Sequence, residues 1–383
     1  MSRANTGEYF PLLDALRVFA AISVLVLHLH TVVGLPVPDT YPLIWFRFGL
    51  YGVEIFFAIS GAVILQALLA ERQRGLQGHR RRFMWRRWWR IAPLLIVTGA
   101  FDIWCNKPGF FARPDAWEMI AAHLAFVHNC FMFSSGGING PSWTLGLEMQ
   151  FYLLAALCGV VLLGRRYAFI FVVSLAAIGL IWRAFFFWFF DAGPAGASPA
   201  PAHFTSQLPG TLDGFAGGML AILGYWRWGS AAPRRSRRIW AMGLGLVGLI
   251  GWILVIETAS ANAVIYWQTP VTVVYLRALI ALSSAAWVAA TLLAGQDFSG
   301  ARWLREAGKL TYGIYLWHMP VLVLVLRVAP DSGPLVQSAM IVGLTFALAV
   351  IGWRFVEKPA IALGRRLNQP FKEEEPHAPC PRS

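Results

Sequence analysis

Asp14, Arg17 and His28 could do chemistry, and all three interrupt one long apolar stretch, residues 11–33. They are 3 and 11 positions apart, and because three helical turns take about 10.8 residues, they share one stripe of a helix. Arg17 and His28 are then about 16 Å apart along the helix axis. An imidazole can act as a general base or a nucleophile near neutral pH. The shared stripe therefore favours a functional role for these residues over a purely structural one.

A structural alternative stays open for these residues. It consists of an Asp14–Arg17 ion pair and a histidine that is hydrogen-bonded to a neighbouring helix. His30 is two positions beyond His28, faces another direction and fits an interfacial position.

Glu148 is the second candidate, about two turns into a helix predicted to begin near Ser142. Tyr152 is four positions further and shares its face. We expect Glu148 at a depth comparable with that of His28, where a carboxylate can hold the histidine tautomer and favour its protonated form. A buried structural hydrogen bond is the alternative.

Tyr312, Tyr315 and His318 recur every three residues on a slanted helical stripe. Tyrosines alone would indicate an interfacial belt, whereas the added histidine favours the lining of a cavity. Further intramembrane charges are expected to be either pathway residues or members of internal ion pairs: Glu54, Asp102, Arg183, Asp213 and Arg277.

The densest basic segment covers residues 80–93 and contains Arg86, Arg87 and Arg90. Arginines next to tryptophans are typical of a topology signal that meets anionic lipid headgroups. The compatible alternative is a phosphate cradle for an anionic cytosolic ligand, because guanidinium groups bind phosphate in a bidentate manner.

The amino-acid composition shows what class of protein must position these groups. Of 383 residues, 57% are hydrophobic and 13% charged, which excludes a water-soluble enzyme. The net charge of +13 does not indicate nucleic-acid binding, because the arginines stand in short blocks between apolar runs. The four cysteines have no paired spacing, so we expect unpaired thiols and no metal site.

The apolar runs predict an all-α, polytopic membrane bundle of about ten spanning helices. The expected spans are 11–33, 43–70, 91–106, 142–163, 168–190, 207–226, 239–256, 271–294, 310–329 and 335–357. Residues 1–360 would form the membrane domain, and residues 361–383 a disordered cytoplasmic tail.

Arginine placement sets the expected orientation. Arginine-rich loops alternate with nearly arginine-free ones, which predicts that both termini are cytoplasmic. Residues 115–134 would break this alternation if they crossed, so we expect an outer-face or re-entrant helix there, followed by a glycine-rich turn.

Six short motifs occur in order between about residues 10 and 360. They are Arg17 with His28, the run 52–57 with Ser60-Gly61, Arg86-Arg87 with 90–93, the run 142–145 with Glu148 and 151–152, the run 312–318, and Glu357-Lys358-Pro359. Together they resemble the acyltransferase-3 family of membrane O-acyltransferases. Met149-Gln150 departs from the second acidic or polar residue that many members carry.

The resemblance implies a helix bundle that takes acyl groups, acetyl by default, from cytosolic acyl-CoA to hydroxyls of carbohydrates or glycolipids at the cell envelope. No permanently bound cofactor is implied. On this reading His28 is the general base or acyl carrier, Glu148 orients it, and Arg17 lines the path of the acyl arm. The groups expected to bind acyl-CoA are Arg86, Arg87, Arg90, Tyr315 and His318.

The resemblance also implies the inner membrane of a bacterium, with the bilayer and an unidentified partner protein as further contacts. Asp14, Glu54, Tyr152, Asp213 and Tyr312 are left as pathway or structural residues. A transporter or flippase for a glycolipid or small polar solute is the rival, because it too needs intramembrane histidine, glutamate and arginine. A scaffold subunit is a third alternative.

Overall fold

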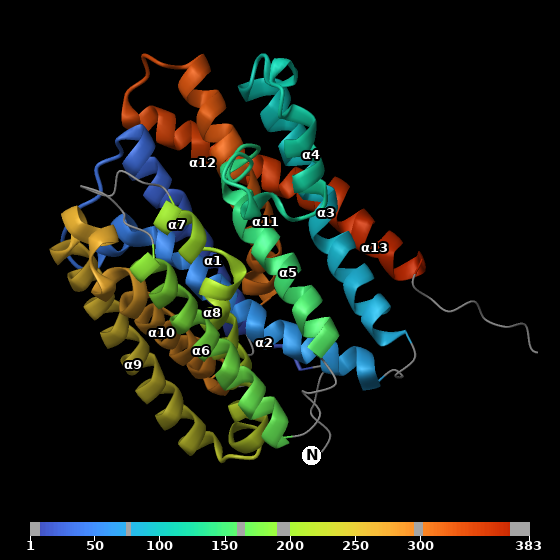
Figure 1. Ribbon diagram of the computed structural model, residues 1–383, viewed down its shortest axis with the longest axis vertical. Coiled ribbons are helices and arrows are strands. Elements are labelled where there is room, and N and C mark those ends of the chain that lie inside the picture. The colour runs from blue at the N-terminus through green and yellow to red at the C-terminus, as the bar shows by residue number, and fades with distance from the viewer. Residues whose placement is uncertain (1–7, 74–77, 159–164, 190–199, 295–301, 368–383) are drawn as a thin grey trace, which may run out of the picture.

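The computed structural model describes residues 8–73, 78–158, 165–189, 200–294 and 302–367. In these ranges the chain forms an all-helical bundle (Figure 1). Its α-helices are α1 (Pro11–His28), α2 (Gly52–Gln73), α3 (His79–Asn106), α4 (Ala116–Leu124), α5 (Trp143–Cys158), α6 (Arg165–Phe189), α7 (Ala200–Thr205), α8 (Leu208–Gly224), α9 (Arg234–Ala261), α10 (Arg277–Ala294), α11 (Arg302–Val328), α12 (Pro334–Gly352) and α13 (Lys358–Leu367).

Seven helices in the described ranges are long and apolar enough to cross a membrane. They are Pro11–Val33, Leu43–Glu71, Tyr167–Phe189, Arg234–Ala261, Val271–Ala294, Arg302–Val328 and Pro334–Leu367. The other three expected spans fall on α3, whose first half is rich in arginine, and on α5 and α8, which have only 16 and 17 residues. An all-helical membrane bundle is confirmed, whereas the count of ten and the cytoplasmic termini stay predictions.

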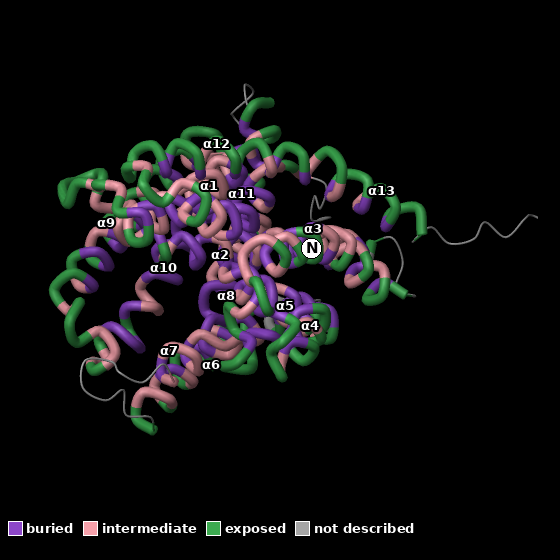
Figure 2. Tube along the Cα trace, turned by 90° about the horizontal axis from the view of Figure 1, so that it is seen from above, coloured by how far each residue is buried: buried purple, intermediate pink, exposed green. Residues whose placement is uncertain are grey.

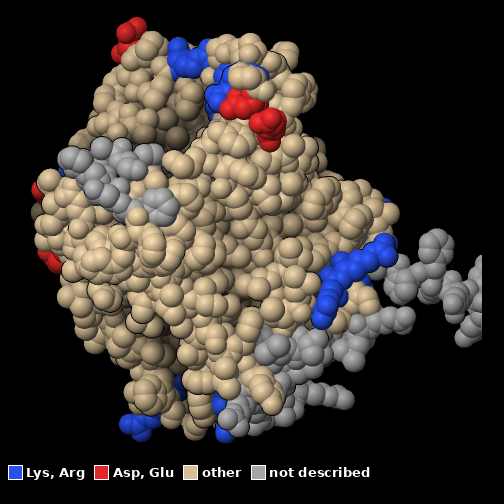
Figure 3. Space-filling model, viewed as in Figure 1, with Lys and Arg blue, Asp and Glu red and all other residues tan. Residues whose placement is uncertain are grey.

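The surface fits a lipid environment. Figure 2 shows buried residues gathered at the centre and exposed ones on the outward faces of the helices. Many of these exposed side chains are large and apolar, such as Trp188 at 76% and Met242 at 75% exposure. On the face in Figure 3 a broad uncharged band lies between charged groups at the two ends, as expected for helices that span a hydrocarbon layer.

The core lies where α2, α5 and α8 meet. Phe215 of α8 is fully buried, and its ring lies 4.0 Å from that of Phe151 and 4.7 Å from that of Phe57, measured between centroids. This aromatic cluster holds α5 against α2, so it fixes which face of each helix points into the neighbouring space.

The segment before α5 is held inside the bundle. The Asn139 backbone N–H donates to Asp102 (2.9 Å), and its side-chain amide donates to Thr98 (3.1 Å) and to the carbonyl of Leu316 (3.0 Å). Asn139 has φ +48°, a conformation that asparagine tolerates better than most residues. Because Leu316 lies in the middle of α11, α5 begins deep in the bundle.

The segment 115–134 is confirmed as non-crossing, because α4 has nine residues and spanning a bilayer takes about 20. The predicted tail is corrected at its start. Residues 361–367 belong to α13, where Gly364 lies against the Trp89 side chain of α3. A Cβ added at Gly364 would lie 2.6 Å from Trp89 Cγ, so only glycine allows this approach. Residues 368–383 lie outside the described ranges.

The crossing of α2 and α8 depends on glycine. A Cβ added at Gly218 would lie 1.7 Å from the Ala58 carbonyl oxygen, and one added at Gly61 would lie 1.9 Å from that of Phe215. Small residues let membrane helices approach closely. We therefore expect Gly218→Ala to cost about 1–3 kcal/mol of stability, seen as a lower thermal unfolding temperature of the detergent-solubilised protein.

The matched control for this prediction is Gly243→Ala in α9, where an added Cβ has no neighbour within 4 Å. It should be neutral or raise stability by up to about 1 kcal/mol, the helix preference of alanine over glycine. Equal unfolding temperatures for the two variants would contradict the packing argument.

Candidate active site

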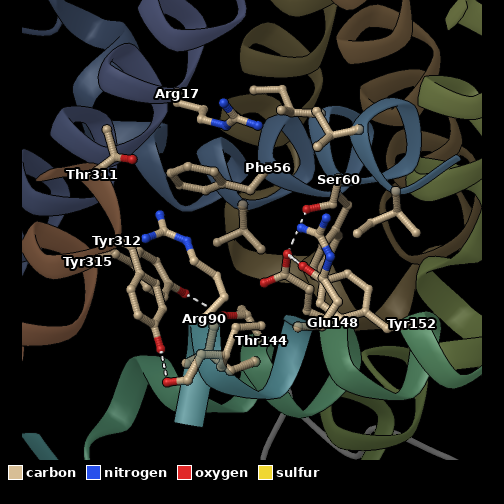
Figure 4. Close-up of a pocket in the computed structure, with 18 of the residues that line it drawn as sticks. Arg17, Phe56, Ser60, Arg90, Thr144, Glu148, Tyr152, Thr311, Tyr312 and Tyr315 are labelled. Atoms are coloured by element: carbon tan, nitrogen blue, oxygen red, sulfur yellow. Dashed lines mark hydrogen bonds between the residues drawn. The ribbon is translucent and has the colours of Figure 1, made fainter. Parts of the chain in front are cut away.

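Side chains of α1, α2, α3, α5 and α11 line a cavity of about 310 Å³ at the centre of the bundle. Figure 4 shows Arg17, Arg90 and Tyr312 on one part of its wall and Ser60, Glu148 and Tyr152 on another. Arg17 lies in the second turn of α1, and Arg90 lies at the end of the arginine-rich first half of α3; the sequence predicts that both helices begin on the cytoplasmic side. The cavity therefore offers positive charge to a ligand with negative charge.

The three arginines of the cavity differ in their partners. Arg17 forms an ion pair with Asp14 (2.6 Å), and Arg90 forms one with Glu357 (2.8 Å). Among the described residues Arg87 has neither an ion-pair nor a hydrogen-bond partner, and its buried Nε is unsatisfied. Its guanidinium lies 5.6 Å from the ring centroid of Phe83 and 5.9 Å from that of Tyr152. Arg87 is thus a half-buried cation available to an external anion.

Arg86 does not join Arg87 and Arg90 in the cavity lining, contrary to its predicted role. It forms an ion pair with Glu71 at 3.1 Å, and Arg82 lies 3.5 Å from the same carboxylate. The reason is helical: Arg86 and Arg87 are adjacent on α3 and so point about 100° apart. Arg87 and Arg90, three positions apart, share the cavity face.

Glu148 and Tyr152 both line the cavity, as their shared helical face predicts. Ser60 donates to Glu148 Oε1 at 2.9 Å, and the Tyr152 hydroxyl donates to the same oxygen. Contacts between Glu148 and His28 are absent from the described interactions. The expectation of equal depth is wrong, because α5 begins inside the bundle and carries Glu148 down to the level of the arginines.

His28 meets His318 instead. Their ring centroids lie 5.1 Å apart, where the ends of α1 and the middle of α11 pack together. His28 Nδ1 lies 2.8 Å from the Val24 carbonyl and His318 Nδ1 lies 2.7 Å from that of Tyr315. A carbonyl only accepts, so both Nδ1 atoms carry a proton, and in the neutral ring this leaves Nε2 as the acceptor.

Both Nε2 atoms of this histidine pair are then basic lone pairs. His318 Nε2 is buried without a partner in the described chain, and no described hydrogen bond engages His28 Nε2. His318 does not line the cavity, so its expected place in the donor channel is corrected to this pair. Two open imidazole nitrogens on facing helices are suited to moving a proton.

Tyr315 lies between the cavity and the histidine pair. Its ring centroid is 5.8 Å from that of His318 and 5.8 Å from that of Phe56. Its hydroxyl lies 3.0 Å from Thr144 Oγ1 and 3.2 Å from the Pro141 carbonyl. Tyr315 lines the cavity as predicted, and Tyr312 does so too with its hydroxyl on the Ile91 carbonyl at 2.7 Å. Tyr315 thus contacts both the cavity and the histidine pair.

Three acidic residues of uncertain role turn out to be paired. Glu54 lies 3.4 Å from Arg277, and Asp213 binds Arg183 through two contacts of 2.6 and 3.0 Å. Asp14 pairs with Arg17, as the structural alternative predicts. Buried ion pairs of this kind satisfy charges that lipid cannot solvate.

Ser60, Phe56 and Thr144 also line the cavity, and sequence reasoning missed them as site residues. The signal was helical spacing: on α2 the lining residues fall at positions 53, 56, 57, 59, 60, 63 and 64, which lie on one side of a helix. Glu71 was missed as the partner of Arg86, because no spacing relates residues on different helices.

The turn before α5 is supported by two stacked imidazoles. The rings of His123 and His128 are 4.0 Å apart and nearly parallel, and His128 Nε2 donates to the Ser142 carbonyl at 2.8 Å. Burial, helped by His123, lowers the pKa of His128 to about 4. The turn that sets the depth of α5 thus has a neutral His128 at physiological pH.

Comparison with known proteins gives one family. The model of that family, described as an acyltransferase domain, matches residues 10–354. The peptidoglycan O-acetyltransferase OatA of Listeria monocytogenes is 24% identical over 378 residues, 92% of this chain and 56% of that protein. The O-acetyltransferase OatA of Staphylococcus aureus is 26% identical (94% and 58%), and the putative peptidoglycan O-acetyltransferase YrhL of Bacillus subtilis is 25% identical (94% and 56%).

The chain thus spans less than two thirds of the length of these curated relatives. No solved structure matches.

The Arg183–Asp213 pair yields a stability prediction. Asp213→Asn leaves Arg183, which is 1% exposed, without its counter-charge. Removing one partner of a buried pair costs about 3–5 kcal/mol, so the thermal unfolding temperature in detergent should fall by many degrees. The control is Asp115→Asn, whose partner Arg113 is exposed at the surface. A stable Asp213→Asn protein with altered activity would favour the pathway role instead.

Proposed function

The chain belongs to the acyltransferase-3 family, and on that premise we propose that it is a membrane O-acyltransferase. It would move an acyl group, acetyl by default, from cytosolic acyl-CoA to a hydroxyl of a cell-envelope carbohydrate in a bacterial inner membrane. One observation supports this most: Tyr315 separates a cavity that contains Arg87, which has no ion-pair partner in the described chain, from two imidazoles whose Nε2 atoms have no described hydrogen-bond partner.

The donor site follows from the charge of acyl-CoA. Coenzyme A carries phosphates at one end and its thioester at the end of a long flexible arm. Arg87 supplies a half-buried guanidinium that forms no ion pair or hydrogen bond in the described chain, which suits a phosphate. The arm then has about 16 Å to cover from the level of Arg17 to that of His28, 11 residues later on α1.

The transfer itself needs one proton movement in each direction. His28 Nε2 takes the proton of the acceptor hydroxyl while the oxygen attacks the thioester carbonyl carbon. The carbon–sulfur bond breaks, and the thiolate receives a proton from the imidazolium, which yields an ester and free coenzyme A. His318, with its own Nε2 open at 5.1 Å between ring centroids, can relay that proton to the sulfur.

Glu148 takes another role than the one predicted. With Ser60 and Tyr152 bound to one carboxylate oxygen, it shapes the cavity wall opposite Arg90 and balances the arginine charge when no donor is bound. The acceptor is proposed to be a carbohydrate, since curated relatives are named peptidoglycan O-acetyltransferases. Transport of a glycolipid has no comparable support, but it remains an outcome of the test below.

His28→Ala should lower acyl transfer by about 10²–10⁴-fold, the contribution of a positioned general base. The measurement follows labelled acetyl from acetyl-CoA to a polysaccharide acceptor in membranes, with protein insertion checked by detergent extraction and gel filtration. His30→Ala is the control, because His30 bonds to the Leu35 carbonyl and Arg47 rather than to His318.

Activity of His28→Ala near that of the wild type would remove the catalytic role. Wild-type membranes that move a glycolipid across the bilayer without forming any labelled ester would establish the transporter in its place.

Arg87→Gln should weaken acetyl-CoA binding by about 10–100-fold, since a hydrogen bond to a charged group contributes about 1.5–3 kcal/mol. Binding can be measured by calorimetry on the purified protein in detergent. Arg81→Gln is a matched control on the same helix, because Arg81 is exposed and does not line the cavity. Unchanged affinity in Arg87→Gln would leave this arginine only a topological role.

A further inference from the structure

A second polar cavity of about 310 Å³ lies on a different side of α5. Its lining includes Asn129, Ser135, Trp143, His203, Ser206 and Gln207. These residues come from the segment before α5, from the first residue of α5 and from α7 with the turn that follows it. The arginine pattern predicts both connecting segments to be on the outer side of the membrane, opposite the arginine end of α3.

The amide groups of this cavity are held in fixed orientations. Asn129 Nδ2 donates to Gln207 Oε1 at 3.0 Å, and Gln207 Nε2 donates back to the Asn129 carbonyl at 2.7 Å. Gln207 also lies 3.2 Å from His203 Nε2. Polar groups that are already oriented bind a ligand at a lower entropic cost than mobile ones.

This network rests on the rigid part of the bundle. Gln150 of α5 donates to Asn129 Oδ1 at 2.8 Å and to the Phe126 carbonyl at 2.9 Å. Gly146, one turn before Gln150, leaves the space for the Asn129 side chain, since an added Cβ would lie 2.1 Å from Oδ1. No pattern in the sequence predicts that Gln150 holds Asn129 in place. The comparison with the family pattern identifies Met149-Gln150 only as a departure from it.

The chemistry of the lining indicates a neutral, hydroxyl-rich ligand. Among the described residues that line this cavity none is Asp, Glu, Lys or Arg. Burial lowers the pKa of His203, so its imidazole is neutral at physiological pH. The half-buried indole of Trp143 offers a flat apolar surface beside these amides and hydroxyls. By contrast, the groove of about 690 Å³ between α3 and α4 is lined almost entirely by apolar side chains and suits hydrocarbon.

We propose that this outer cavity binds one sugar ring of the carbohydrate acceptor, with Trp143 against the ring and His203, Ser206 and Gln207 as hydrogen-bonding partners of its hydroxyl and amide groups. This inference rests on the proposed function and adds the acceptor site to it. The volume is at the lower end of the range for ligand pockets, which suits a single ring rather than an oligomer.

Two connections join this cavity to the inner one. Trp143 precedes Thr144, which lines the inner cavity and lies 3.0 Å from the Tyr315 hydroxyl. Ser206 lies 3.3 Å from Arg277, and Arg277 forms an ion pair with Glu54 of α2. The same helix lines the inner cavity with Val53 and Phe57. An acceptor held here would therefore lie behind the wall of the inner cavity, on a different side of α5 from the donor.

The test uses the full-length protein in detergent and N,N′-diacetylchitobiose as a soluble probe. Saturation-transfer NMR measures its binding to the wild type and to the double variant His203→Ala/Ser206→Ala. We expect at least a tenfold weaker affinity in the double variant and a raised KM for the acceptor with an unchanged KM for acetyl-CoA. The control is Asn262→Ala, an amide at the end of α9 that bonds only to the Thr258 carbonyl among its described side-chain contacts.

Trp143→Phe is a second variant that keeps an aromatic ring for packing and should weaken binding less than the double variant. Each protein must match the wild type in gel filtration and thermal unfolding. Absence of probe binding to the wild type, or equal affinity in the double variant, would overturn the proposed sugar site. Binding that depends on His203 and Ser206 in a protein without transferase activity would keep this site and reject the proposed function.

Discussion

The cost of burying charge in lipid is the constraint on which this structure depends. A charge inside a bundle surrounded by hydrocarbon must find a counter-charge. The described chain meets this demand repeatedly with arginine–carboxylate pairs between different helices. These pairs are Arg183–Asp213, Arg277–Glu54, Arg90–Glu357 and Arg86–Glu71. Each of them joins two helical segments, so these buried charges also determine how the helices are arranged. Arg87 stands apart, because it forms neither an ion pair nor a hydrogen bond in the described chain and only the Glu148 carboxylate acts on its charge from a longer distance.

The depth at which α5 begins has the largest consequence for the site. Asn139 fixes the start of this helix against Thr98 and Leu316, so Glu148 belongs to the arginine cavity and not to the histidine pair. The site is thereby divided into two layers with different chemistry. One layer is charged and contains Arg17, Arg87 and Arg90, whereas the other has two imidazoles whose Nε2 atoms have no described hydrogen-bond partner. Tyr315 connects the two through Thr144 on one side and His318 on the other.

Sequence reasoning predicts what depends on residues within one helix. The shared stripe of Asp14 and Arg17 is confirmed by their ion pair, and the common face of Glu148 and Tyr152 by their hydrogen bond to each other. Periodicity also locates the apolar helices, because 3.6 residues per turn relates neighbours along one chain. Periodicity does not predict which residues of different helices come into contact. The pairing of Arg86 with Glu71 and of His28 with His318 depends on packing angles and on where each helix begins, and neither is written in a local spacing.

An enzyme of the proposed kind must bring a cytosolic thioester and an external alcohol together without opening a path for water. In this bundle two cavities lie on different sides of α5. One is lined by arginines and receives Thr144 from α5. The other is polar, has no Asp, Glu, Lys or Arg among its described lining residues, and receives Trp143 from α5. Tyr315 and Phe56 close the inner cavity toward the histidine pair. Since exclusion of water strengthens electrostatic interactions and suppresses hydrolysis of an activated ester, a transfer layer surrounded by packed side chains between the two pockets would favour transfer to the alcohol over loss of the thioester.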